Sequence, residues 1–271
     1  MLIRSIVGAL SSVLFPAPCR ICEELLTVAS RIPICDRCLN SFECINSPMC
    51  RCCGRPFTSP HAADAIQPLC RLCRIGAYAF DRARSYGIYD DALSAAVVLL
   101  KDEGVRPLGD WFAGRLAEVV RQYAKDWRID LVVPVPLHPG RLRERGYNQA
   151  ELIAKPLAKK LGLRFGSYLL VRTKPRPGQL ILSRTERWTS VRGAYATRER
   201  ARVDNLRILL IDDVLTTGAT LDACSRALKR AGAAAIFAVT VARVVPGWSH
   251  LGVERDRRSI RETVPADTAS L

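Results

Sequence analysis

The chain has 271 residues and a formal net charge of +15 at neutral pH, and hydrophobic residues make up 49% of it. This length and apolar content predict a globular protein with a large core and room for two domains. The apolar stretch 6–15 follows Arg4 and resembles the core of a signal peptide, but it is too short to span a bilayer. We expect no membrane span, and we expect 6–15 to form a short helix packed on the next domain.

Cysteine pairs dominate the segment that follows. The pattern Cys-x-x-Cys occurs four times within 55 residues, and each occurrence can place two thiolates on one metal ion. Two such pairs complete a tetrahedral zinc site, so we predict two structural zinc ions. The simplest pairing is sequential, although a cross-braced pairing stays open. The predicted ligands are Cys19, Cys22, Cys35 and Cys38 for the first ion, and Cys50, Cys53, Cys70 and Cys73 for the second.

Three cysteines are left over. Cys52 is an alternative ligand to Cys53, Cys224 is expected to be a small buried hydrophobic residue, and Cys44 has no assigned role. A disulfide framework is the alternative to metal binding. The pairs precede a nucleotide-type fold, which favours zinc binding in a reducing, cytoplasmic compartment. Because the segment has few large apolar residues, we expect it to need the metal to fold.

The next segment alternates strand and helix patterns. Apolar positions at helical spacing predict helices that end near Gly104 and Gly162, the second with a bend at Pro156. Two prolines close the strand before that second helix and predict a rigid loop after it. In chain order, the predicted elements are a strand over 79–90, a helix over 91–104, a helix over 111–124, a strand over 131–137, a helix over 148–162 and a strand over 235–245.

Basic residues are concentrated in the middle of the chain. Residues 137–202 contain sixteen Lys and Arg but four Asp and Glu. Eight zinc-bound thiolates and two zinc ions would lower the formal charge to about +11, so the protein stays basic. Such a cluster suits a highly anionic sugar diphosphate or a nucleic acid, while a solvated basic face is the alternative.

The most informative motif is RILLIDDVLTTGAT at 207–220. Its apolar run predicts a buried parallel strand, with Asp212 and Asp213 at the carboxyl end of that strand, where ligands bind in open α/β sheets. Two carboxylates can accept hydrogen bonds from the 2′ and 3′ hydroxyls of a ribose. A threonine-rich loop with a glycine then enters a predicted helix over 221–232, whose N-terminus favours a phosphate.

These patterns predict an α/β protein with a parallel sheet flanked by helices and a small double zinc ribbon at its N-terminus. We expect three parts: 1–76 with the N-terminal helix and the zinc ribbons, 77–245 with the sheet, and a mobile charged tail over 246–271.

The motif at 207–220 resembles the sugar-phosphate loop of type I phosphoribosyltransferases. The stretch LVVPVPLHPGRLRERGYNQAELIAKPLAKKLG, followed by KPRPGQLILSRTERWTSVRGAY and by that loop behind a cysteine module, resembles the ComF family. These are bacterial phosphoribosyltransferase-like proteins linked to competence and DNA utilisation. The resemblance extends to about Val245. One departure is Ser190, where the family usually has Asn before the Val-Arg-Gly-Ala run.

The resemblance implies roles for individual residues. Asp212 and Asp213 would hold the ribose, and the segment after Pro136 would meet the pyrophosphate, with Mg²⁺ carried by the substrate. Residues 172–195 would form a lid that excludes water. The implied ligands of the 5′-phosphate are Thr216, Thr217, Gly218, Ala219 and Thr220; those of the pyrophosphate are Arg141, Arg143 and Arg145, with Asn148 and Gln149 orienting it or capping the helix; those in the lid are Gln179, Arg184 and Arg187.

Two functions follow as expectations. The first is transfer of a phosphoribosyl group from phosphoribosyl pyrophosphate to a nitrogen nucleophile. The second is a non-catalytic, ligand-sensing or single-stranded-DNA-binding adaptor of the competence machinery, with a competence helicase or another DNA-processing protein as partner. Only 18 of 271 residues are aromatic, without an evident stacking ladder in the basic segment, which favours the ligand pocket over DNA recognition. No residue pattern identifies the acceptor.

Overall fold

The structure is a computed structural model, and it describes residues 17–28, 30–46, 48–57, 68–175, 184–199, 202–246 and 248. The expected helix over 6–15 and Gln179 lie outside the described residues, as does the expected tail apart from Pro246 and Trp248. Within the described part of the chain, we find no helix that is long and apolar enough to cross a membrane.

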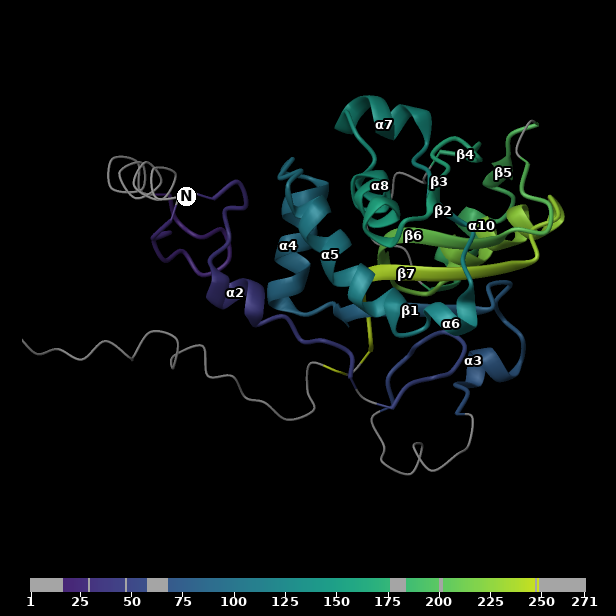
Figure 1. Cartoon of the computed structure of the whole chain (residues 1–271), viewed down its shortest axis with the longest axis horizontal. Helices are drawn as coiled ribbons and strands as arrows, with labels where there is room; N and C mark the ends of the chain where they lie inside the picture. Colours follow the sequence, from purple (N-terminus) through teal and green to yellow (C-terminus); the bar gives the residue numbers. More distant parts are fainter. Residues whose placement is uncertain are drawn as a thin grey trace, which may run out of the picture.

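The fold is a parallel α/β sheet with helices, behind an N-terminal module that holds two cysteine clusters (Figure 1). Each strand and helix predicted for the sheet domain has a counterpart in the structure, although several ends differ by two or three residues. In chain order, the described elements are α2 (Asp36–Asn40), α3 (Arg71–Arg74), β1 (Arg82–Ile88), α4 (Asp91–Lys101), α5 (Leu108–Arg121), α6 (Ala124–Trp127), β2 (Leu131–Pro134), α7 (Pro139–Arg145), α8 (Gln149–Leu161), β3 (Arg164–Phe165), β4 (Leu170–Arg172), α9 (Arg184–Val191), β5 (Tyr195–Thr197), β6 (Arg207–Leu215), α10 (Ala219–Arg230) and β7 (Ala235–Arg243).

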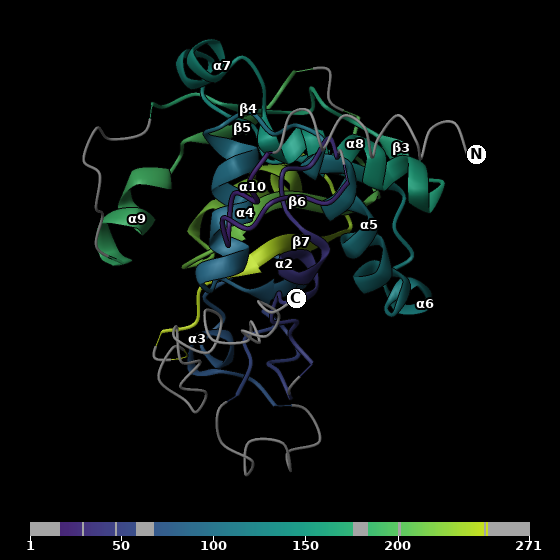
Figure 2. The ribbon, with the colours of Figure 1, turned by 90° about the vertical axis from the view of Figure 1, so that its left-hand side faces the viewer.

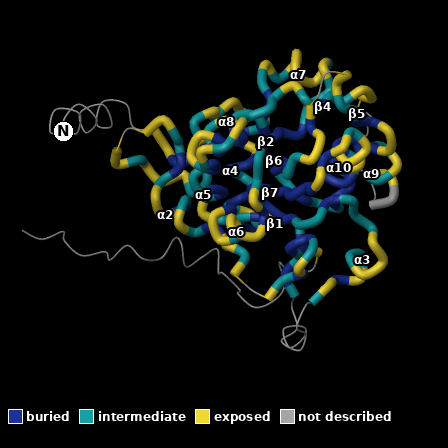
Figure 3. Tube along the Cα trace, turned by 45° about the vertical axis from the view of Figure 1, so that its right-hand side comes forward, coloured by how far each residue is buried: buried dark blue, intermediate teal, exposed yellow. Residues whose placement is uncertain are grey.

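Five parallel strands form the main sheet in the order β1-β7-β6-β2-β3. The two longest strands, β6 and β7, lie side by side at the centre and are buried over almost their whole length. Strands covered on both faces read as continuous apolar runs, which explains the ILLI run of β6 and the AIFAV run of β7. Figure 3 shows this centre of the sheet in the colour of buried residues.

The two faces of the sheet have separate cores. Side chains alternate along β6, so that Leu209 and Ile211 pack towards α4, α5 and α8, whereas Ile208 and Leu210 pack towards α10. The first half of the cysteine module joins the first core, because Phe42 contacts the ring of Trp111 on α5 edge to face. The second half joins the core on the α10 side. Figures 1 and 2 show α2 and α3, one from each half, at different places on the sheet domain.

Several elements differ from the sequence expectation. The expected loop after Pro136 contains the helix α7, which begins with Pro139 at its first turn and is capped by His138, whose Nδ1 accepts from the Gly140 N–H at 3.2 Å. Strand β6 continues to Leu215, beyond the two aspartates, and α10 begins at Ala219, two residues before its expected start. The antiparallel pair β4-β5 was not expected at all.

Candidate functional site

The two aspartates of the 207–220 motif lie towards the carboxyl end of β6, with Asp213 two residues before its last residue, Leu215. The exposed fraction is 8% for Asp212 and 6% for Asp213. Oδ1 of Asp212 accepts from the Asp213 N–H at 2.9 Å, and Oδ1 of Asp213 accepts from the Val214 N–H at 3.0 Å. These local bonds use one oxygen of each carboxylate and hold the two side chains against the strand.

The two carboxylates differ in their surroundings. Oδ2 of Asp213 lies 3.7 Å from the ammonium nitrogen of Lys101 and 3.5 Å from Nε2 of Gln149. Burial raises the pKa of Asp212 well above its ordinary value, and the neighbouring charge of Asp213 raises it further. A carboxyl pair of this kind is poised to receive hydrogen-bond donors or a cation, since either would lower the cost of ionising Asp212.

The threonine-rich loop connects β6 to α10. Gly218 stands at the N-cap of α10 with φ 83°, a left-handed conformation that favours glycine. Oγ1 of Thr217 accepts from the Ala219 N–H at 3.3 Å. Because α10 begins at Ala219, the predicted phosphate ligands Ala219 and Thr220 lie in its first turn, where backbone N–H groups have no partner within the helix. This segment, 216–220, is called the phosphate loop below, after the ligand predicted for it.

The basic segment after β2 reaches the acidic pair through one arginine. The Arg145 side chain is 7% exposed, donates to Oε1 of Gln149 at 2.6 Å, and donates to Oδ1 of Asp102 at 3.0 Å. Arg141 is 55% exposed, pairs with Glu144 at 2.9 Å and lies 3.8 Å from the same Asp102 oxygen. Arg143 is exposed on α7. The structure therefore links Arg145 to Asp213 through Gln149, leaves Arg141 at the edge of this network, and, among the described residues, shows no contact of Arg143 with it.

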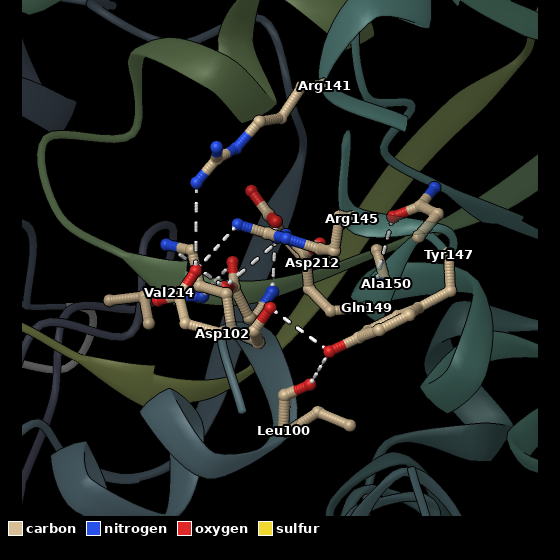
Figure 4. A network of polar contacts seen from close by, with 12 residues as sticks. Leu100, Asp102, Arg141, Arg145, Tyr147, Gln149, Ala150, Asp212 and Val214 are labelled. Carbon is tan, nitrogen blue, oxygen red and sulfur yellow. Dashed lines mark hydrogen bonds and ion pairs between the residues drawn. The ribbon is translucent and has the colours of Figure 1, made fainter. Parts of the chain in front are cut away.

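The start of α8 fixes this arrangement. Asn148 caps the helix, because its Oδ1 accepts from the Ala150 N–H at 3.1 Å, and its Nδ2 donates to the carbonyl of Val135 at 3.0 Å. The side chain of Gln149 then spans the distance between Arg145 and Asp213. Figure 4 shows the resulting network of polar contacts between α4, α7, α8 and β6.

Three residues of this network were not predicted from the sequence. Lys101 and Asp102 come from the end of α4, and the Tyr147 hydroxyl donates to the carbonyls of Leu100 and Lys101 at 2.6 and 3.1 Å. These bonds tie the last turn of α4 to the segment between α7 and α8. The sequence contains one signal for these residues, namely charged residues at the end of an apolar helix. This signal does not identify a site, because cations are also common at the C-terminus of a helix, where they stabilise it.

The expected lid is described in part. Its flanks pair as β4 and β5, and Arg172 donates to the hydroxyl of Tyr195 at 3.2 Å. Arg184 and Arg187 belong to α9, but their side chains lie outside the description, as does the whole of Gln179. The roles predicted for these three residues stay predictions.

The cysteines form two clusters with sequential pairing. Cys19, Cys22, Cys35 and Cys38 make the first cluster, and Cys50, Cys53, Cys70 and Cys73 make the second; within each, the sulfur atoms lie within 4.8 Å of one another. The clusters share a detail, because the Cys35 N–H donates to Sγ of Cys19 and the Cys70 N–H donates to Sγ of Cys50, each at 3.3 Å. Four converging sulfurs with N–H···S bonds fit tetrahedral Zn²⁺.

The other three cysteines stand outside these clusters. Cys53 rather than Cys52 belongs to the second cluster, and Cys44 is exposed. Cys224 on α10 is fully buried, as expected of a small hydrophobic residue. The four-cysteine sites have no open position for a substrate, so the metal they fit is structural.

Two family models match the chain. Residues 10–74 match the double zinc ribbon domain, and residues 148–250 match the phosphoribosyl transferase domain. Among solved structures, the adenine phosphoribosyltransferase of Thermoanaerobacter pseudethanolicus is 17% identical, and the match covers 54% of this chain and 83% of that one with a TM-score of 0.31. At this score the fold assignment rests on the sheet topology and the family models.

Curated relatives match across most of the chain. The "DNA utilization protein YhgH" of Salmonella typhimurium is 29% identical over 82% of this chain and 94% of its own length. "Competence protein F" of Haemophilus influenzae is 26% identical over 73% of this chain and 91% of its own length. "Competence protein ComFC" of Bacillus subtilis is 27% identical over 74% of this chain and 80% of its own length.

Proposed function

We propose that this chain, a member of the ComF family, binds phosphoribosyl pyrophosphate with Mg²⁺. The phosphoribosyl group is then transferred to a nitrogen nucleophile in the context of DNA uptake or utilisation. The observation that carries the proposal is the buried pair Asp212 and Asp213, followed after four residues by Gly218 at the N-cap of α10. The same combination offers hydroxyl acceptors and phosphate donors at one edge of the sheet.

In this proposal the acidic pair holds the ribose. Each carboxylate keeps one oxygen in a backbone hydrogen bond and turns the other to the 2′ or 3′ hydroxyl. The 5′-phosphate accepts hydrogen bonds from the backbone of the phosphate loop and from the hydroxyls of Thr216, Thr217 and Thr220. The positive end of α10 adds a favourable field. The sugar is thereby fixed at both ends, with its anomeric carbon between them.

The pyrophosphate would leave towards α7. We assign this role to Arg145, because it contacts Gln149 beside the acidic pair, and Arg141 can join it from the exposed side. Mg²⁺ would be held by the oxygens of the substrate and would neutralise charge on the departing pyrophosphate. The transition state has oxocarbenium character, so positioning and charge stabilisation supply most of the catalysis. The residues named here single out no acceptor beyond the class of nitrogen nucleophiles.

The second candidate is a non-catalytic adaptor that senses the ligand or binds single-stranded DNA. It is favoured by the excess of sixteen basic over four acidic residues in 137–202 and by the names of the relatives. A competence helicase or another DNA-processing protein would then be its partner. We propose that either function takes place in the cytoplasm, where thiolate clusters keep their metal. We also propose that the chain has three parts, over 1–76, 77–245 and 246–271.

The deciding experiment measures Mg²⁺-dependent release of pyrophosphate from phosphoribosyl pyrophosphate over a panel of nitrogen nucleophiles, with single-stranded DNA included. Release that depends on an acceptor supports the transferase. Ligand binding that changes DNA affinity without any turnover supports the adaptor and contradicts the transferase.

A further inference from the structure

A cavity of about 200 Å³ lies between the second cysteine cluster and the phosphate loop. Cys53 and Cys70 line it on one side, and Thr216 and Thr217 line it on the other. Although some 150 residues separate these walls in the sequence, the second cluster and the phosphate loop are neighbours in the fold. The first cluster packs in the core of the opposite face.

Tyr78 joins the two walls of this cavity. Its hydroxyl donates to the carbonyl of Thr217 at 2.9 Å. Its ring lies against Gly218, because a Cβ added to that glycine would come within 2.6 Å of Cε1 of Tyr78. The ring also stacks on Phe80, with centroids 4.7 Å apart, and on Trp188 of α9, with centroids 5.9 Å apart. Tyr78 thus touches the phosphate loop at its most constrained residue and reaches α9 as well.

The chain runs directly from the second cluster to Tyr78. Cys73 lies in α3, and the turn after this helix is closed by the Gly76 N–H, which donates to the carbonyl of Cys73 at 3.2 Å, and by the Ala77 N–H, which donates to that of Leu72 at 3.1 Å. On the far side of Tyr78, the Ala79 N–H donates to Oδ1 of the buried Asp222 in the first turn of α10 at 2.7 Å. Tyr78 is therefore held between a metal ligand and the helix that follows the phosphate loop.

A second connection passes through Arg243 at the end of β7. This arginine is 5% exposed, donates to the carbonyl of Cys53 at 2.6 Å, and has another nitrogen 3.5 Å from Sγ of Cys53. Four thiolates around Zn²⁺ carry a net charge of −2, which the guanidinium partly balances. The next residue, Val244, donates through its N–H to the carbonyl of Leu215, immediately before Thr216, at 3.0 Å.

The first cluster has no comparable connection among the described residues. The first half of the module is linked to the sheet domain by the ion pair between Arg20 and Glu103, whose side chains are 50% and 39% exposed. Two backbone hydrogen bonds, at 2.9 and 3.1 Å, also join Glu43 and Ile45 to β1, and neither involves the phosphate loop. Exposed ion pairs contribute little. The two clusters differ in their contacts with the phosphate loop but can bind the same metal in the same protein. The first cluster therefore serves as an internal control for effects of the ligand on the second.

We propose that Tyr78 is a positioning residue that couples zinc at the second cluster to the phosphate loop, so that a sugar phosphate bound at the loop and zinc bound at this cluster stabilise each other. The inference rests on the proposed ligand site. Coupling between two binding sites is reciprocal, so the ligand must raise the zinc affinity of the second cluster by the factor by which zinc strengthens ligand binding. Slower loss of zinc from this cluster is the expected consequence of that higher affinity.

The test follows zinc release from the full-length zinc-loaded chain into a chelator, with and without Mg²⁺ and phosphoribosyl pyrophosphate. Thiols freed during release are alkylated and mapped to their peptides, which assigns each released ion to its cluster. We expect the ligand to slow release from the second cluster about fivefold or more and to leave the first cluster unchanged. Equal protection of both clusters, or of neither, in a protein that binds the ligand would overturn the inference.

The matched variants are Tyr78→Phe, which removes the bond to Thr217 and keeps the ring, and Tyr168→Phe, which changes a tyrosine that is 72% exposed. We expect Tyr78→Phe to keep both zinc ions and to lose most of the protection, whereas Tyr168→Phe behaves as wild type. Full protection in Tyr78→Phe contradicts the role of its hydroxyl. If calorimetry finds no ligand binding to wild type, the proposed function fails; if the ligand binds without selective protection, the coupling fails alone.

Discussion

The ammonium nitrogen of Lys101 lies 3.7 Å from Oδ2 of Asp213, so the last turn of α4 reaches the acidic pair of β6. The same turn provides Asp102, which accepts a hydrogen bond from Arg145 at 3.0 Å. One helix end thereby contacts both the residues assigned to the ribose and the arginine assigned to the pyrophosphate. Its position sets the distance between these two parts of the site.

Replacing Lys101 tests this relationship. We expect Lys101→Met to weaken binding of phosphoribosyl pyrophosphate about tenfold, because it removes a cation beside Asp213 and at the entrance of an anionic ligand. Isothermal titration calorimetry in the presence of Mg²⁺ measures this loss. The control is Lys160→Met, since Lys160 has similar exposure, 35% against 31%, and pairs with the exposed Asp110 on α5. Equal affinities of the two variants would contradict the assignment.

The raised pKa of Asp212 predicts that this residue destabilises the ligand-free protein. A buried carboxyl whose pKa is raised contributes stability at low pH, and that contribution is lost as the pH rises through its pKa in the folded protein. We therefore expect the free energy of unfolding of Asp212→Asn to rise relative to wild type between about pH 5 and about pH 8, because only the wild-type carboxyl has to ionise as the pH rises. Urea unfolding of both proteins at the two pH values measures it.

The control for this prediction is the same substitution at another buried aspartate. Asp222 accepts from the Ala79 N–H at 2.7 Å and pairs with Arg226 at 2.8 Å, so Asp222→Asn is expected to lower the free energy of unfolding. If Asp212→Asn is destabilising in the same way at both pH values, the account of the acidic pair is wrong.

Two arginines of α7, Arg145 and Arg143, should contribute differently to ligand affinity. We expect Arg145→Gln to lower ligand affinity at least tenfold, because this side chain is buried and holds Gln149 and Asp102. Arg143→Gln should change affinity by less than about twofold, since Arg143 is exposed and outside the network. Calorimetry on both variants tests the ranking, and a stronger effect at Arg143 would reverse the assignment.

Two zinc ions per chain are expected by elemental analysis, one from each cysteine cluster. Chelation should lower the melting temperature of the whole chain and not of the N-terminal module alone, because both clusters are connected to the sheet domain. Phe42 beside the first cluster contacts Trp111, and Arg243 at the end of β7 contacts the second cluster. A zinc content of zero in freshly purified protein, or a melting curve that does not respond to metal removal, would contradict this prediction.

The sequence predicted the sheet and the residues whose pattern is local. Three patterns each predict local structure from a few neighbouring residues. They are the apolar run before Asp212, the glycine at the start of α10 and the four cysteine pairs. The network around Asp213 could not be predicted, because Lys101 and Tyr147 approach it through tertiary packing from 112 and 66 residues away. The helix α7 was missed because its proline, glycine and arginines also suit a loop. The pairing of β4 with β5 was missed because a long connection separates the two strands in the sequence.

The central claim is that Asp212 and Asp213 bind the ribose of phosphoribosyl pyrophosphate. Calorimetry with Mg²⁺ on wild type and on the double variant Asp212→Asn, Asp213→Asn tests it most directly, with zinc content measured on the same samples. The account predicts binding by wild type, no detectable binding by the variant, and two zinc ions per chain in both proteins. Equal affinities of the two proteins would contradict it.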